Sequence, residues 1–196
     1  MSRMVDHDKM IREEWFKDHR AAYSVLDDGQ EHKVERLYWA RPGSSFYSVL
    51  YLFYGGTLFI AGDLGEAVYR WHPDIGTLKD LAKLDLDYFK GKCCASEVGR
   101  DFVQWDEDKA AQRVREWLRE ERKHEPETKA WSDFLCDDGR EALNHKDAWL
   151  RWLEDHGHEY FGDDWWEFAP NFGQIISIRC RAHLIGIKMA FHQLKD

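Results

Sequence analysis

The chain has 196 residues, a formal net charge of −9 and a pI near 5.6, and it is long enough to bury a sizeable core. The acidic balance argues against general binding to nucleic-acid phosphates, which needs a basic face, and it suits docking onto a basic protein surface. The N-terminus lacks the apolar segment of a signal peptide, and no apolar run approaches the length of a membrane span. We therefore expect a cytoplasmic protein.

Antiparallel strands are the first elements that the sequence predicts. Residues 8–25 suit a short amphipathic helix or an irregular lead-in, because apolar side chains recur among charged ones. Aromatic and β-branched residues then fill the stretch 46–71, which Gly55-Gly56 interrupts where a two-residue hairpin needs positive φ. With a further alternating strand before this stretch, residues 33–71 are expected to form a sheet of about four strands.

The remainder of the chain, mainly residues 77–196, is predicted to be helical and to cover one face of that sheet. Gly157 is expected to end one of the helices, and residues 158–170 to form a loop after it. The predicted fold class is α+β, with an N-terminal antiparallel β-meander and a C-terminal set of helices in a single domain, 1–196. The expected helices are 78–89, capped by Thr77, then 109–123, capped by Asp106 or Asp108, then 131–136, 140–155 and 172–194, the last packed on the sheet.

Two carboxylates lie three residues apart in the turn that starts at Gly62. Asp63 and Glu66 have the chemistry of an acid–base pair or of divalent-metal ligands, so one hypothesis is a small metal- or nucleotide-dependent hydrolase centred on them. The alternative is structural, because an Asp often caps its own turn while glycines take the demanding dihedrals. The sequence favours this second interpretation.

Histidines and cysteines do not form a recognised site in the sequence. His156-Gly157-His158, with His145 and Glu159 nearby, has the residue types of a zinc site but not the ligand spacing. Cys93-Cys94 with His183 could be imagined as a nucleophile and base, yet no nucleophile motif surrounds them. We therefore predict no metal, no cofactor, no catalytic residues, and free, mostly buried thiols.

The predicted helix over residues 109–123 is basic and aromatic, which is typical of a surface that touches nucleic acid. Glutamates interleave with the arginines and offset their charge, so we interpret it as a solvated, salt-bridged face and do not expect direct nucleic-acid binding. The residues concerned are Arg113, Arg115, Trp117, Arg119 and Arg122, with Glu116, Glu120 and Glu121 between them.

The strongest candidate for a binding site is both acidic and aromatic. Adjacent tryptophans cannot both face one core on a regular strand, so one of the pair is expected to point outward as an anchor for a basic partner. The alternative is a loop that folds back over the core with its carboxylates in water. The candidate contact residues are Asp163, Asp164, Trp165, Trp166 and Glu167.

Three segments within residues 34–97 carry a resemblance: the strand V-E-R-L-Y-W, the turn G-D-L-G-E and the later D-Y-F-K-G-K-C. Together they resemble a family of small proteins of no settled activity encoded by tailed phages and prophages. The resemblance implies a viral accessory protein and no particular catalytic residue. Acidic accessory phage proteins of this size often inhibit host defence, anti-CRISPR proteins being the best-known group.

Our first hypothesis is therefore a stoichiometric inhibitor that binds a basic surface of a host defence protein or ribonucleoprotein complex in an infected bacterium. The alternatives are the hydrolase centred on Asp63 and Glu66, and a phage structural or morphogenetic component.

Overall fold

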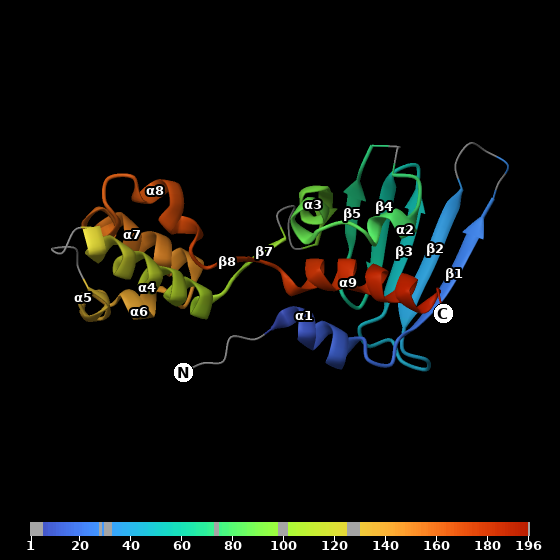
Figure 1. Cartoon of the computed structure of the whole chain (residues 1–196), viewed down its shortest axis with the longest axis horizontal. Coiled ribbons are helices and arrows are strands. Elements are labelled where there is room, and N and C mark those ends of the chain that lie inside the picture. Colours follow the sequence, from blue (N-terminus) through green and yellow to red (C-terminus); the bar gives the residue numbers. More distant parts are fainter. Residues whose placement is uncertain are drawn as a thin grey trace. The chain divides into compact units, whose positions relative to one another are not determined.

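The computed structural model describes residues 6–27, 29, 33–72, 75–97, 102–124 and 130–195. The chain divides into two compact units (Figure 1). Val103–Ile175 form the helical unit, and Val5–Phe102 together with Ile176–Asp196 form the sheet unit. The fold class is α+β, as predicted. That the units act as one domain stays a prediction.

Six antiparallel strands form the sheet, in the order in which they follow one another along the chain. Gly55 and Gly56 join two of them with φ of 52° and 74°, which confirms the predicted hairpin turn. The strands are β1 (Arg20–Leu26), β2 (Val34–Ala40), β3 (Val49–Tyr54), β4 (Thr57–Gly62), β5 (Ala67–Arg70) and β6 (Cys93–Ser96).

The two edge strands of this sheet, β1 and β6, were not predicted. The stretch 8–25 instead contains α1 (His7–Met10), the π-helical turn η1 (Ile11–Trp15) and the start of β1. Most side chains of β1 are exposed, so the strand lacks the alternation of buried and exposed residues that marks a half-buried strand. β6 is only four residues long and is half-exposed. Both segments form strands because they pair with a neighbouring strand, and neither has a sequence pattern that predicts a strand.

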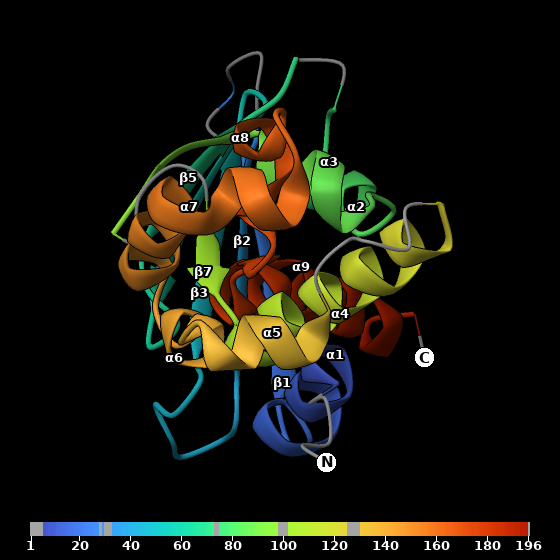
Figure 2. The ribbon, with the colours of Figure 1, turned by 90° about the vertical axis from the view of Figure 1, so that its left-hand side faces the viewer.

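One helix, α9 (Ile178–Gln193), crosses one face of the sheet, as predicted (Figures 1 and 2). Ser177 caps its first turn, and the preceding residues form a short strand instead of the expected helix start. Gly186 faces Tyr51 and Trp39 of the sheet so closely that a side chain there would overlap Tyr51. The helix therefore lies directly on the strands.

Two short helices pack beside α9 where one was predicted. Thr77 caps α2 (Leu78–Leu81), and α3 (Leu86–Gly91) begins after a second cap, Asp85, whose carboxylate accepts from the Tyr88 N–H. The second cap ends the continuous helix that periodicity predicts. The sequence further predicts a strand break at His72-Pro73-Asp74 and a helix break at Glu125-Pro126-Glu127. Apart from His72, these residues lie outside those that the structure describes.

The helical unit surrounds a core of aromatic rings. A short strand, β7 (Val103–Trp105), pairs with β8 (Gln174–Ile176) where the chain enters and leaves it. The first helix begins at Glu107, two residues before the predicted start, and Asp106, one of the two expected caps, accepts from the Lys109 N–H. The helices are α4 (Glu107–His124), α5 (Trp131–Cys136), α6 (Gly139–Ala142), α7 (Lys146–Phe161), α8 (Trp165–Phe168) and the 3-10 turn η2 (Ala169–Asn171).

The prediction that Gly157 ends a helix is wrong. α7 continues to Phe161 and ends at Gly162, whose φ is 78°. Gly157 is needed for packing instead, because a Cβ there would collide with the ring of Trp165. The predicted loop 158–170 therefore contains the end of α7, all of α8 and part of η2.

In the part of the chain that the structure describes, no helix combines the length and apolar character needed to cross a membrane.

Candidate functional site

The acidic aromatic segment forms a surface around α8, which we call the α8 surface: Asp163, Asp164, Trp166 and Glu167. All four side chains are exposed, and Trp166 keeps 61% of its area accessible. Its neighbour Trp165 is half-buried and packs against the core of the helical unit. One tryptophan of the pair thus points outward, as expected.

Several contacts fix the position of α8 on the helical unit. Trp165 occupies the space that Gly157 leaves on α7, and Phe168 stacks on Trp117 with ring centroids 4.3 Å apart. The Ala169 carbonyl, directly after α8, accepts from the buried indole N–H of Trp149 at 2.8 Å. Trp166 therefore projects from a platform that is already ordered.

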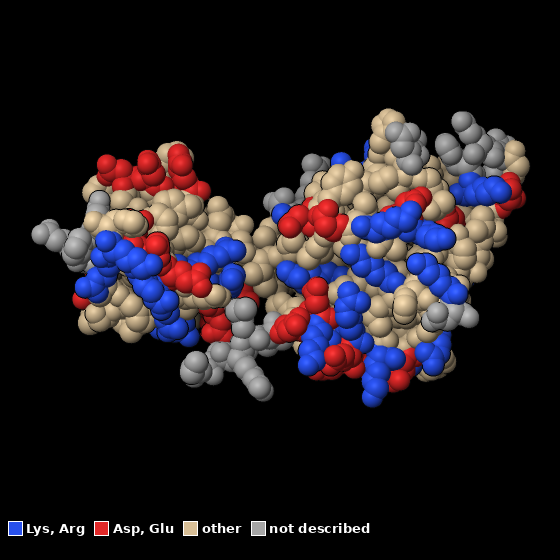
Figure 3. Space-filling model, viewed as in Figure 1, with Lys and Arg blue, Asp and Glu red and all other residues tan. Residues whose placement is uncertain are grey.

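Charge on this surface is negative. Figure 3 shows acidic side chains gathered over α8 and basic side chains over α4. Asp163 contacts His158 Nε2 at 2.5 Å, an exposed pair that leaves the other two carboxylates of the surface facing solvent. Carboxylates around an exposed indole complement a basic, partly apolar partner.

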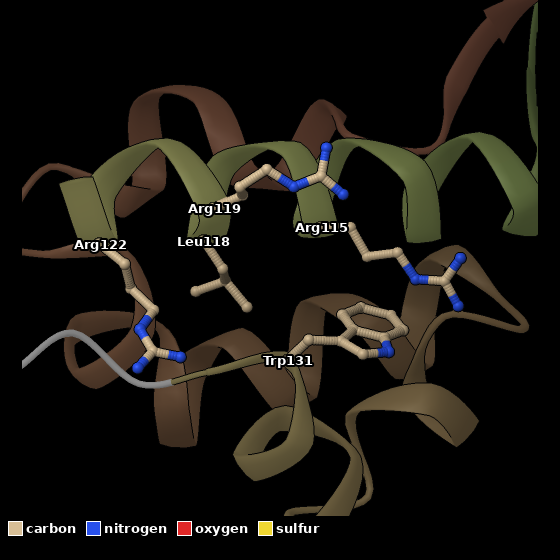
Figure 4. Close-up of a pocket in the computed structure, with 5 residues that line it drawn as sticks. All are labelled: Arg115, Leu118, Arg119, Arg122 and Trp131. Carbon is tan, nitrogen blue, oxygen red and sulfur yellow. The ribbon is translucent and has the colours of Figure 1, made fainter. Parts of the chain in front are cut away.

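A pocket of about 400 Å³ lies between α4 and α5 (Figure 4). We call it the arginine pocket. Three of its residues recur at one-turn intervals on one face of α4, and the buried Leu118 and half-buried Trp131 supply apolar walls. The guanidinium of Arg115 lies 4.4 Å from the Trp131 ring centroid, in a cation–π contact. The lining residues are Arg115, Leu118, Arg119, Arg122 and Trp131.

The sequence predicts that glutamates offset the arginine charge along the whole of α4. The structure shows instead that the two kinds of side chain are unevenly distributed around the helix. Glu116 accepts from Gln112 and Glu120 pairs with Lys123, so these glutamates have partners outside the pocket. Arg113 donates to two backbone carbonyls, those of residues 171 and 172. The remaining arginines gather on one side. Composition could not show this sorting, because it depends on which neighbours each side chain meets after folding.

The turn that holds Asp63 and Glu66 has a structural explanation. The Asp63 carboxylate accepts from the Tyr47 N–H at 2.7 Å, and Tyr47 itself has a φ of 57°, an unusual conformation for a non-glycine residue. Glu66 is exposed. Asp63 therefore has a structural contact, but it stabilises the loop before β3 and not, as the sequence interpretation had it, its own turn. The expected glycine dihedrals are present, since Gly62 and Gly65 have φ of 136° and 91°.

Behind this turn lies a buried polar network in the sheet unit. His183 is fully buried, and its ring nitrogens lie 3.2 Å from Tyr69 Oη and 3.3 Å from the Leu64 carbonyl. Burial lowers the pKa of His183 to about 4. The ring is therefore neutral near pH 7, and both of its nitrogens are engaged inside the core.

None of the four cysteines is in a disulfide, and fewer of them are buried than expected. Only Cys180 is fully buried, and burial raises the pKa of its thiol to about 11. Cys94 and Cys136 are exposed, and Cys93 is half-exposed. A thiol with the pKa of Cys180 is a poor nucleophile at neutral pH.

Among the described residues, one group has metal-ligand types in mutual reach: Asp137, His156 and Glu159, with ligand atoms within 4.8 Å of one another. The Asp137 carboxylate also accepts from Tyr160 Oη at 2.6 Å. Of the two histidines considered in the sequence, only His156 belongs to this group. His158 lies against Asp163. Such a trio has the donor types of a divalent-cation site.

The face of the sheet opposite α9 carries apolar side chains. Tyr38 pairs with Leu50, and Leu52 pairs with Phe59, which in turn neighbours Val68. Phe59 is 47% exposed. This face is a second surface that binding experiments have to distinguish from the α8 surface.

Comparison with protein-family models, with curated proteins and with solved structures gave no match to this chain. The resemblance to phage proteins over residues 34–97 therefore stays a prediction.

Proposed function

We propose that the chain is a binding protein that inhibits a host defence complex by stoichiometric docking onto a basic surface of that complex. The single observation that carries this proposal is Trp166, 61% exposed on an ordered α8 and flanked by Asp163, Asp164 and Glu167. Tryptophan is enriched among the residues that dominate binding energies, and surrounding charges speed and orient the encounter.

The phage resemblance supplies the class of partner: a protein or ribonucleoprotein complex, of the anti-CRISPR target type, in the cytoplasm of an infected bacterium. Surfaces that normally hold DNA or RNA are basic, and an acidic protein competes for them without imitating nucleic acid as a whole. Because α8 is held by Trp165 and Phe168, little ordering of this surface is required on binding.

The test is a pull-down with the tagged chain from a bacterial host lysate, run in parallel with two variants. The α8 variant carries Trp166→Ala, Asp163→Asn and Asp164→Asn. The control variant carries Phe46→Ala, Asp18→Asn and Asp87→Asn, which removes an aromatic ring of 69% exposure and two exposed carboxylates from the sheet unit.

We expect the wild type and the control variant to retain one defence complex at near-stoichiometric yield, and the α8 variant to lose it. Unchanged capture by the α8 variant would exclude this surface. Capture of virion proteins instead would support the morphogenetic alternative. A further variant, Phe59→Ala, tests the face of the sheet opposite α9. Loss of binding in this variant alone would place the interface on that face.

A further inference from the structure

The arginine pocket is not used by the proposed function. Arg115, Arg119 and Arg122 follow one another along a single face of α4, at spacings of four and three residues. A helix rises about 1.5 Å per residue, so the first and last of them are separated by roughly 10 Å along its axis. Figure 4 shows Leu118 between Arg122 and Trp131, on the same side of α4 as the pocket.

The positive charge of this pocket is not neutralised by the residues that the structure describes. None of these makes an ion pair with Arg115, Arg119 or Arg122. Of the neighbouring glutamates on α4, Glu116 accepts from Gln112 and Glu120 pairs with Lys123. Arg115 has an orienting contact, the face of Trp131 at 4.4 Å, which leaves the charge of its guanidinium intact. Clustered arginines without anionic partners repel one another, so an anionic ligand would be stabilised there.

The shape and lining of the pocket indicate which anion. Guanidinium groups bind phosphate oxygens in a bidentate fork, and a row of them suits successive phosphates better than one isolated ion. The recess of about 400 Å³ also has apolar walls, Leu118 and Trp131, against which a sugar or base can pack. A recess favours a flexible single strand over a duplex, whose bases are stacked inside.

We propose that the arginine pocket binds the phosphate backbone of single-stranded nucleic acid. This departs from the expectation drawn from composition, because the net charge of −9 describes the whole chain and not this side of α4. The net negative charge of the chain repels nucleic acid at longer range, so binding is expected only at this local cluster of positive charge. Binding is therefore expected at low ionic strength and is expected to weaken steeply as salt is added.

The test is fluorescence anisotropy of a labelled oligothymidylate with the purified full chain at low salt. The pocket variant carries Arg115→Gln, Arg119→Gln and Arg122→Gln. The control variant removes the same charge from exposed residues of the helical unit that do not line the pocket, with Arg140→Gln, Lys146→Gln and Arg151→Gln. Circular dichroism and melting curves establish that both variants fold.

Loss of three charge-assisted contacts is expected to weaken binding by at least about tenfold in the pocket variant and by less than about threefold in the control. The slope of log Kd against log salt is expected near 2 for the wild type, since each neutralised phosphate contributes about 0.7, and near zero for the pocket variant.

Four results would overturn the proposal. The oligonucleotide could fail to bind at low salt, or both variants could lose the same affinity for it. Polyglutamate could compete as strongly as unlabelled oligothymidylate, or a DNA duplex could bind more tightly than the single strand. A nucleoside triphosphate that competes as strongly as the unlabelled oligonucleotide would assign the pocket to free nucleotides. That result would also contradict the proposal that the pocket binds a single strand. None of these outcomes depends on whether a defence complex is captured through α8.

Discussion

The two units of this protein differ in where their ionisable groups lie. In the sheet unit, ionisable groups such as His183 and Tyr69 are buried and hydrogen-bonded to each other within the core. In the helical unit, the core consists mainly of stacked rings, including Trp149 on Trp152 at 5.3 Å, and most charged groups lie on its surfaces, although the buried Tyr160 donates to Asp137. Buried ionisable groups make stability depend on pH, whereas exposed ones are available for partners.

The largest expected effect tests whether aromatic packing holds the helical unit together. Trp149 is fully buried, contacts several rings and donates its indole N–H to the Ala169 carbonyl. Trp149→Ala is expected to lower the free energy of unfolding by about 3–5 kcal/mol, because a large cavity remains and the Ala169 carbonyl loses one of its two hydrogen bonds. Chemical denaturation followed by circular dichroism measures this change.

The matched control for that substitution is Trp166→Ala, which removes the same side chain from an exposed position. Its effect on unfolding is expected to stay within about 0.5 kcal/mol. Equal destabilisation by the two substitutions would contradict the contrast between a structural and a surface tryptophan.

The next effect concerns pH and the sheet unit. The pKa of His183 is lowered to about 4 by burial, against an ordinary value of 6.5. Below pH 6.5 the unfolded chain binds a proton that the folded chain does not, so stability falls as the pH drops and levels off near pH 4. The shift corresponds to a loss of roughly 3 kcal/mol over this window. The free energy of unfolding measured at several pH values gives this profile.

Burial also lowers the pKa of His19, so this residue contributes in the same direction. His183→Gln is expected to flatten the profile partly, because it removes the buried imidazole that the folded chain keeps neutral. If His183→Gln proves too unstable to study, NMR titration of the wild-type imidazole resonances gives the pKa directly. A value near 6.5 would contradict the account of the core.

The smallest expected effect addresses the turn before β5. Asp63→Ala removes the acceptor of the Tyr47 N–H, so stability should fall by about 1 kcal/mol, measurable as a lower denaturant midpoint. Glu66→Ala, an exposed neighbour, should change it little. A metal- or nucleotide-dependent hydrolytic activity lost in both variants would instead revive the hydrolase hypothesis.

Local chemistry in the sequence was sufficient to predict some elements. Gly55-Gly56 specifies its hairpin, and Asp106 and Thr77 specify helix starts, because each acts on residues within one turn of chain. β1 and the role of Gly157 could not be predicted in this way, since one depends on pairing with β2 and the other on the ring of Trp165.

The two candidate sites also differ in how far the sequence could predict them. An outward tryptophan beside acidic residues follows from two adjacent rings competing for one core, so the sequence predicted the α8 surface. The arginine pocket follows from Trp131 of α5 meeting α4, a contact between two separate helices. The sequence did not predict it, because glutamates alternate with the arginines along the chain, whereas Glu116 and Glu120 contact other residues after folding.

The most direct test of the docking proposal is inhibition of the captured defence complex by titrated protein. The wild type is expected to abolish its activity at a near-equimolar ratio. Trp166→Ala is expected to need roughly 30-fold more protein, which corresponds to about 2 kcal/mol for an anchoring tryptophan. Identical titration curves for the wild type and Trp166→Ala, with both proteins folded, would contradict docking through the α8 surface.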